Sequence, residues 1–261
     1  MSNLDTIPTL HRSFLEKAIP VIQNDERFCG LAAGGSMVLG TMDEFSDLDL
    51  VLVVNDCDYE SVMPQRKELA SQLGELLNAF TGEHVGEPRL VICLYGPEIL
   101  HVDLKFVSYK DINEKVEIPV ILWEKDECLT QGFDGTEAEF PALDPVWLAE
   151  RFWCWVHYSA LKIGRRELFE GVSSIDFIRS EVLGPLLLMK HGARPQGQRR
   201  IELYATEEEQ EILRKTIAIY NFESCISALR STVYLYKKIR SVDGDQKLED
   251  LVMDYIDRIT K

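Results

Sequence analysis

The chain lacks any long apolar run. Its densest apolar stretch, residues 183–189, is far shorter than the roughly 20 residues that a membrane-spanning helix needs. The amino terminus also lacks a basic region followed by an apolar stretch, which is the pattern of a secretory signal. Internal repeats and low-complexity tracts are absent as well. From these absences we expect a cytoplasmic protein with no membrane partner.

The sequence has few cysteines, and its basic residues are fewer than its acidic ones. The six cysteines are scattered, with no Cys-x-x-Cys and no paired Cys/His spacing of the kind that binds zinc. Lysine and arginine number 28 against 44 aspartates and glutamates, which gives a formal net charge of -16. Nonspecific nucleic-acid binding depends on basic side chains that neutralise phosphates. We therefore expect no nucleic-acid partner, and the acidic balance better suits a small or cationic one.

The chain has enough residues for two modest domains or one large one. It is 261 residues long and 46% hydrophobic, which provides ample core for both. In the first half, apolar spacing predicts a helix over residues 10–28 that leads into a glycine turn, and a second helix over residues 60–80. Strands are predicted over residues 47–54, 89–95, 99–107 and 119–123.

The second half has a different pattern. Glycines, a proline and several acids over residues 131–144 predict a connector, so we place the domain boundary there, with domains at 1–142 and 143–261. From residue 145 onward, strand signals fade and helical spacing takes over, at residues 146–169, 174–190, 207–220, 222–240 and 247–259. The fold class predicted is α+β, a mixed sheet with helices followed by an all-helical domain.

One motif in the first half predicts chemistry. Gly34-Gly35-Ser36 is followed eleven residues later by Asp47-Leu48-Asp49, at the head of an apolar run. A glycine turn offers backbone N–H groups and a hydroxyl that can hold phosphate. Because side chains alternate along a strand, Asp47 and Asp49 project from one face while Leu48 points to the core. Paired carboxylates repel each other, and a cation such as Mg²⁺ relieves that repulsion.

A third carboxylate lies on a later strand. In the strand predicted at residues 99–107, the apolar positions leave His101, Asp103 and Lys105 on the opposite face. If this strand lies beside the first, the three carboxylates converge and can hold two cations about 4 Å apart, as in two-metal phosphoryl transfer. His101 then contacts substrate or is simply a satisfied structural histidine.

The ordered combination of Gly35-Ser36, Asp47-Leu48-Asp49 and Asp103 resembles the nucleotidyltransferase superfamily of DNA polymerase beta. Compact size and a helical second half look most like the aminoglycoside and lincosamide nucleotidyltransferases. The resemblance implies transfer of AMP from ATP to a hydroxyl of such an antibiotic, or of another small acceptor. It also implies that Asp47 and Asp49 are ligands of two Mg²⁺ ions, that Asp103 is a further ligand or the general base, and that Gly35 and Ser36 contact phosphate.

By analogy with family members whose helical domain forms the other wall of the cleft, Lys162 or Arg166 neutralises the triphosphate. The alternative is a solvated helix face with ordinary salt bridges. A second functional hypothesis is a noncatalytic module of the same fold, of the binding or antitoxin type, since a fold alone does not fix function. Sequence leaves open the acceptor, the preferred nucleotide, and whether the protein is a monomer or a homodimer.

Overall fold

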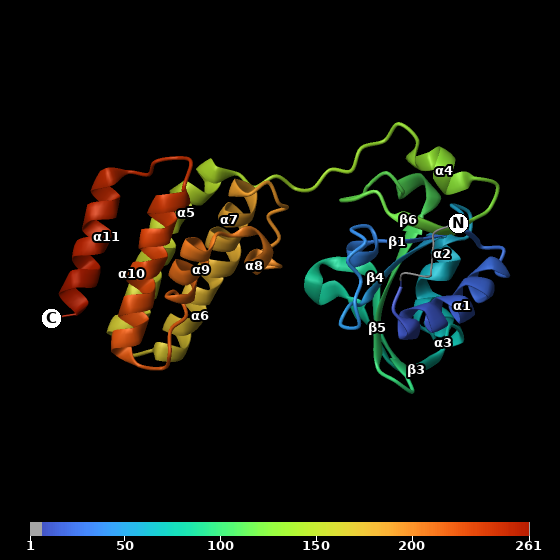
Figure 1. The fold of residues 1–261 in the computed structure, drawn as a ribbon, viewed down its shortest axis with the longest axis horizontal. Coiled ribbons are helices and arrows are strands. Elements are labelled where there is room, and N and C mark those ends of the chain that lie inside the picture. The colour runs from blue at the N-terminus through green and yellow to red at the C-terminus, as the bar shows by residue number, and fades with distance from the viewer. Residues whose placement is uncertain (1–6, 261) are drawn as a thin grey trace. The chain divides into compact units, whose positions relative to one another are not determined.

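The computed structural model describes residues 7–260. Two compact units divide the chain between Phe140 and Pro141, and we call them the sheet unit and the helical unit (Figure 1). Among the described residues, no helix combines the length and the apolar composition that crossing a bilayer requires. Together, the mixed sheet with its helices and the helical second half confirm the predicted α+β class.

The sheet unit is built on one six-stranded mixed sheet with strand order β3-β4-β5-β2-β1-β6. The central pair, β2 and β5, is parallel, and every other neighbouring pair is antiparallel. The strands are β1 (Phe28–Ala33), β2 (Leu48–Val54), β3 (Glu75–Gly82), β4 (Glu87–Gly96), β5 (Leu100–Ser108) and β6 (Val120–Glu124). The helices of at least four residues are α1 (Thr9–Gln23), α2 (Tyr59–Val62), α3 (Arg66–Gln72) and α4 (Cys128–Phe133).

The two faces of the sheet carry separate apolar clusters. On one face, α1 and α3 pack against the leucines of β2 and against alternate residues of β5, such as Leu104 and Phe106. On the other face, α4 contributes Leu129 to a smaller cluster with Val53 and Val107. Strand alternation therefore works as predicted, and the odd-numbered residues of β2 and β5 share the α4 face.

The helix expected over residues 60–80 is wrong in its second half. Two short helices, α2 and α3, end at Gln72, and Gly74 leads into the edge strand β3. A Cβ at Gly74 would lie 3.2 Å from the Tyr95 ring, so the turn into β3 packs tightly on β4. Leucines at 73, 76 and 77 fit a helical stripe as well as a half-buried strand, and pairing with β4 decides the outcome.

The helix predicted to run into the glycine turn is also corrected. Helix α1 ends at Gln23, and the whole of β1 lies between it and Gly34. Every residue of β1 is buried. A short, continuous apolar run of this kind signals an interior strand, but periodicity alone cannot distinguish it from a helical segment.

The helical unit has its own core. Its helices are α5 (Pro145–Gly164), α6 (Leu168–Ile178), α7 (Gly184–Lys190), α8 (Ile201–Tyr204), α9 (Glu207–Arg214), α10 (Phe222–Ile239) and α11 (Gln246–Ile259), with a π-helical turn at Arg179–Leu183. The rings of Phe152 and Tyr236 stack with centroids 3.6 Å apart, which joins α5 to α10. This half is helical, as predicted from the sequence. Two helices are shorter than predicted, because α5 ends at Gly164 rather than at residue 169 and α9 ends at Arg214 rather than at residue 220.

Candidate active site

Two of the predicted carboxylates lie side by side at the centre of the sheet. Asp49 of β2 and Asp103 of β5 are register partners in the parallel ladder. Their neighbours Leu48, Leu50, Val102 and Leu104 are buried in the cluster on the opposite face. Partners in a parallel ladder point to the same side, so both carboxylates lie on the α4 face. Interior strands thus bring together two acids that are 54 positions apart in sequence.

The glycine turn packs directly against this pair. The Gly34 N–H donates to the Asp49 carbonyl oxygen at 2.8 Å, which ties the turn to β2. Gly35 has a φ of 60°, and a Cβ there would lie 2.0 Å from Asp49 Oδ2. Only glycine combines this backbone conformation with so close an approach to a carboxylate. Gly35 and Ser36 then begin a single 3₁₀ turn, Gly35–Met37.

The structure adds Glu117, which the sequence reasoning did not select. Its Oε1 accepts the Gly35 N–H at 2.5 Å, and a Cβ at Gly34 would meet the same oxygen at 2.8 Å. A carboxylate therefore accepts the hydrogen bond of a backbone N–H group that was predicted to bind phosphate. Glu117 lies 82 residues from Gly35 in an irregular segment before β6, so no local spacing signals it.

His101 lies beside Asp103 on β5. Its Nε2 is 2.9 Å from Asp103 Oδ1, and the Asp103 side chain is 21% exposed. The histidine thus contacts the carboxylate, and the partly exposed Asp103 can be reached from solvent. Lys105, two residues further along the same face, instead pairs with Glu87 at 2.9 Å.

Asp47 precedes β2 by one residue and is partly exposed. With His101 it lines a pocket of about 300 Å³ where β2 and β5 begin. Within residues 7–260, no group of three His, Cys, Asp or Glu side chains is arranged to hold a metal ion. The structure therefore pairs Asp49 with Asp103 and leaves the metal-ligand role of all three carboxylates a prediction.

The two basic residues predicted to bind phosphate have partners within the helical unit. Lys162 Nζ lies 2.8 Å from Glu167 Oε2, and that hydrogen bond raises the Lys162 pKa. Arg166 has a φ of 62° in the turn after α5, and its guanidinium stacks 3.5 Å from the centroid of the Phe222 ring. These contacts fit the salt-bridged helix face that the sequence analysis kept as an alternative.

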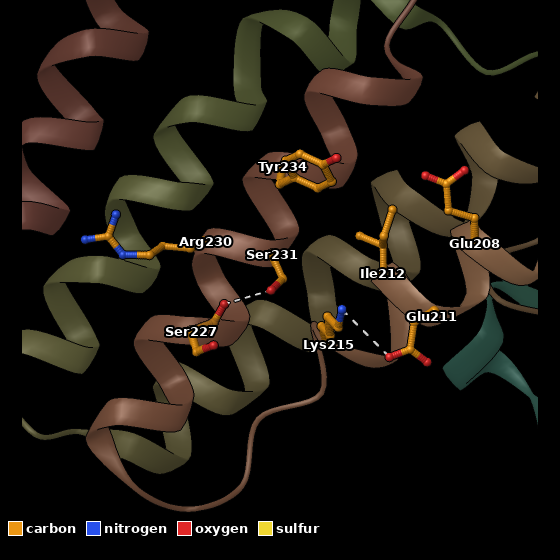
Figure 2. Close-up of a pocket in the computed structure, with 8 residues that line it drawn as sticks. All are labelled: Glu208, Glu211, Ile212, Lys215, Ser227, Arg230, Ser231 and Tyr234. Carbon is orange, nitrogen blue, oxygen red and sulfur yellow. Dashed lines mark hydrogen bonds and ion pairs between the residues drawn. The ribbon is translucent and has the colours of Figure 1, made fainter.

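A cavity of about 600 Å³ lies between α9 and α10 of the helical unit (Figure 2). None of the site residues predicted from sequence lines it. Its basic side chains have acidic partners, since Lys215 pairs with Glu211 at 3.8 Å and Arg230 pairs with Asp257 at 2.5 Å. The cavity is therefore separate from the paired carboxylates, and its charges are of both signs.

Comparison with known families identifies the chain. The model of the streptomycin adenylyltransferase family matches residues 11–250, which include most of both units. The chain belongs to this family. It is therefore a nucleotidyltransferase, and membership argues for the enzyme over the noncatalytic module.

Several solved structures are similar at low identity. They include an aminoglycoside 6-adenyltransferase from Bacillus subtilis, at 14% identity and TM-score 0.42, with 94% of this chain and 97% of that chain covered. A nucleotidyltransferase-like protein from Exiguobacterium sibiricum has 12% identity and TM-score 0.37, with 88% and 75% covered. The CCA-adding enzyme of Thermotoga maritima, complexed with tRNA, has 12% identity and TM-score 0.36, with 96% and 70% covered. A comparison with curated proteins gave no match.

Proposed function

We propose that the protein transfers AMP from ATP to a hydroxyl group of an aminoglycoside, in a reaction that requires Mg²⁺. The observation that best supports this chemistry is the placement of Asp49 directly opposite Asp103 in the parallel ladder. Family membership supplies the reaction class.

The donor set fits magnesium. Two carboxylates on adjacent strands, with Asp47 two residues before one of them, provide the hard oxygen ligands that Mg²⁺ prefers. Asp47, Asp49 and Asp103 would hold the metal. Bound there, Mg²⁺ supplies charge neutralisation for the triphosphate and a lowered pKa for the acceptor hydroxyl.

Asp103 is the proposed general base. A carboxylate that is 21% exposed can reach a substrate hydroxyl, and the hydroxyl proton would pass to its oxygen as the acceptor attacks the α-phosphorus. The contact at 2.9 Å between His101 Nε2 and Asp103 Oδ1 orients the carboxylate. Attack in line and departure of pyrophosphate follow the general pattern of phosphoryl transfer.

The glycine turn is the proposed phosphate contact. Backbone N–H groups at Gly35 and Ser36, with the Ser36 hydroxyl, suit phosphate oxygens. Since Glu117 accepts the Gly35 N–H, the triphosphate would displace this carboxylate when it binds. Lys162 and Arg166 remain candidates for neutralising the triphosphate.

An aminoglycoside suits the charge of the protein. The net charge of -16 favours a cationic acceptor, and the family description names streptomycin. Streptomycin is therefore the first acceptor to test.

The experiment is a pyrophosphate-release assay on the purified protein. We expect release with ATP, Mg²⁺ and one compound of a panel made up of streptomycin, other aminoglycosides and a lincosamide. Removing Mg²⁺ with EDTA should stop release, and replacing it should restore the rate. Failure of every acceptor and every nucleoside triphosphate in the panel, with folded protein, would contradict the proposal. Turnover of the lincosamide alone would overturn the aminoglycoside assignment and leave nucleotidyl transfer standing.

A further inference from the structure

The pocket of about 300 Å³ in the sheet unit has the features of a ligand site. It lies at the end of the sheet where β2 and β5 begin, and it is formed by α1, by the loop before β2 and by the start of β5. The lining residues that carry the argument are His11, Glu44, Phe45, Asp47, Ile99 and His101. The volume is at the lower limit for small-molecule pockets and suits one ring of a larger ligand.

The pocket adjoins the paired carboxylates. Its residues Asp47 and His101 each lie two positions before a member of the Asp49–Asp103 pair. Two residues of a strand span about 6.6 Å. A molecule held in the pocket therefore places a substituent within one strand repeat of the carboxylates, and this distance suits a substrate rather than a remote ligand.

The pocket has an exposed apolar rim, and hydrogen bonds order the turn that carries one of its residues. Phe45 is 87% exposed and Ile99 is 72% exposed. The Phe45 N–H and the Ser46 hydroxyl both donate to Asp43 Oδ1, each at 3.0 Å, which fixes the turn that carries the ring. An ordered turn that presents an exposed aromatic ring beside a pocket is typical of a binding surface.

The buried wall holds one unsatisfied polar atom. His11 is 1% exposed, and its Nε2 lies 2.6 Å from the Ser46 carbonyl oxygen, so this nitrogen is the donor. In that tautomer Nδ1 is an acceptor, and within the described part of the chain it has no hydrogen-bond partner. Because this nitrogen is itself buried, it belongs to the packing behind the pocket wall and is not a contact that the pocket offers to a ligand.

The charge of the pocket selects the ligand. The Glu44 carboxylate and the aromatic ring of Phe45 line it, beside Asp47, which is assigned to Mg²⁺. Carboxylates and an aromatic face both attract cations. The cavity between α9 and α10 lacks this bias, because its acids are paired with Lys215 and Lys238.

We infer that this pocket holds an amino-bearing or guanidino-bearing ring of the acceptor, with Phe45 and Ile99 as its walls and Glu44 as its exposed anion. The inference rests on the proposed function and extends it by naming where specificity for a cationic acceptor arises. Glu44 is a positioning residue for the acceptor and takes no part in the chemical step.

The test is calorimetric titration of the full chain with streptomycin, using variants of the exposed rim that leave the core intact. We expect Phe45→Ala to raise the Kd for streptomycin about ten-fold, and Glu44→Gln to raise it about three-fold. Ile99→Ala should weaken binding in the same direction. Val85→Ala is the matched control, because Val85 is an aliphatic residue of the same unit, is 60% exposed and lies outside the pocket.

Steady-state kinetics separate this inference from the proposed function. The KM for streptomycin should rise in the Phe45 and Glu44 variants, while the KM for ATP stays within about two-fold of wild type. Unchanged streptomycin binding in all three rim variants, with an active wild-type enzyme, would overturn the inference and leave the proposed function standing. A wild-type protein that neither binds nor modifies any aminoglycoside would overturn both.

Discussion

The sheet unit and the helical unit differ in how they treat the residues predicted for the site. In the sheet unit, Asp49 and Asp103 are register partners on interior strands, and Gly35 packs against the first of them. In the helical unit, Lys162 and Arg166 contact Glu167 and Phe222 of their own unit. Sheet register brings distant residues together at fixed positions, whereas long basic side chains on a helix find local partners.

The two units also differ in the roles of their well-ordered carboxylates. Glu209 of α9 is 3% exposed and binds Lys190 and His191, both at 2.7 Å, near the end of α7. Its side chain also completes the capping box with Thr206. This charge joins two helices and lies outside the pocket of either unit. Glu209 thus stabilises the fold of the helical unit, whereas the paired carboxylates of the sheet unit are the ones proposed to take part in the reaction.

Among variants outside the carboxylate pair itself, the largest effect that sharpens this comparison is expected at Gly35. Gly35→Ala should lower kcat/KM for ATP about 100-fold or more, because its Cβ would clash with the Asp49 carboxylate and displace it. Gly40→Ala is the matched control, since Gly40 has a φ of 63° and a Cβ there would meet no atom of the described residues within 4 Å. It shares the backbone strain, so we expect lower stability with activity within about two-fold of wild type. Equal activities in the two variants would contradict the close packing.

Glu209 is expected to show the next largest effect, on stability rather than activity. Burial raises its pKa, but hydrogen bonds from Lys190, the Thr206 backbone and His191 outweigh burial and set the pKa at about 2. The ordinary pKa is 4.5, so the stabilisation is present above about pH 4.5 and is lost as the pH falls toward 2. Glu209→Gln should lower the free energy of unfolding by about 2 kcal/mol at pH 7, after allowance for solvent screening at Lys190.

Denaturant unfolding followed by tryptophan fluorescence measures this loss, because Trp147, Trp153 and Trp155 all lie in α5. The control is Glu207→Gln, at a side chain that is 87% exposed and bound to Arg214, and it should cost less than about 0.5 kcal/mol. Similar losses in both variants, or a Glu209 contribution that persists below about pH 2, would refute the assignment.

A variant at Lys162 tests whether the helical unit contributes to nucleotide binding. If Lys162 neutralises the triphosphate, Lys162→Met raises the KM for ATP about ten-fold and leaves the KM for the acceptor unchanged. Lys215→Met serves as control, because it removes another lysine of the same unit that lies near a glutamate, Glu211, at 3.8 Å. A Lys162 variant with an unchanged KM for ATP would show that this lysine only forms the salt bridge with Glu167.

The smallest effect is expected at Glu117. Removing its charge should ease the binding of phosphate to the Gly35 N–H, so Glu117→Gln should lower the KM for ATP about two- to three-fold. Glu114→Gln, in the same segment and at a side chain that is 71% exposed, should leave it unchanged. A higher KM for ATP in the Glu117 variant would mean that this carboxylate assists nucleotide binding instead of competing with it.

Sequence alone predicted the parts of the site that depend on strand alternation. The faces of β2 and β5 follow from buried leucines and valines, and these place Asp49 and Asp103 on one side. Parallel pairing of β2 with β5 could not be read from the chain, because β3 and β4 intervene between them in sequence. Glu117 was missed for the same reason, since only the tertiary fold brings it to Gly35.

The wrong fold predictions came from segments whose apolar spacing fits two structures. Leu76 and Phe80 match a helical stripe, yet they lie in the edge strand β3. The uniformly apolar β1 carries no period that would distinguish strand from helix. Long amphipathic helices such as α10 and α11 were predicted almost to the residue, because their spacing and their caps agree.

Pyrophosphate release by Asp49→Asn, Asp103→Asn and the double variant tests the central claim most directly, namely that the two register partners act as one catalytic unit. We predict that each single variant loses about 10³-fold in rate, that the double variant loses no more than either, and that all three melt near the wild-type temperature. A single variant that keeps more than about a tenth of the wild-type rate, or losses that multiply in the double variant, would contradict the account.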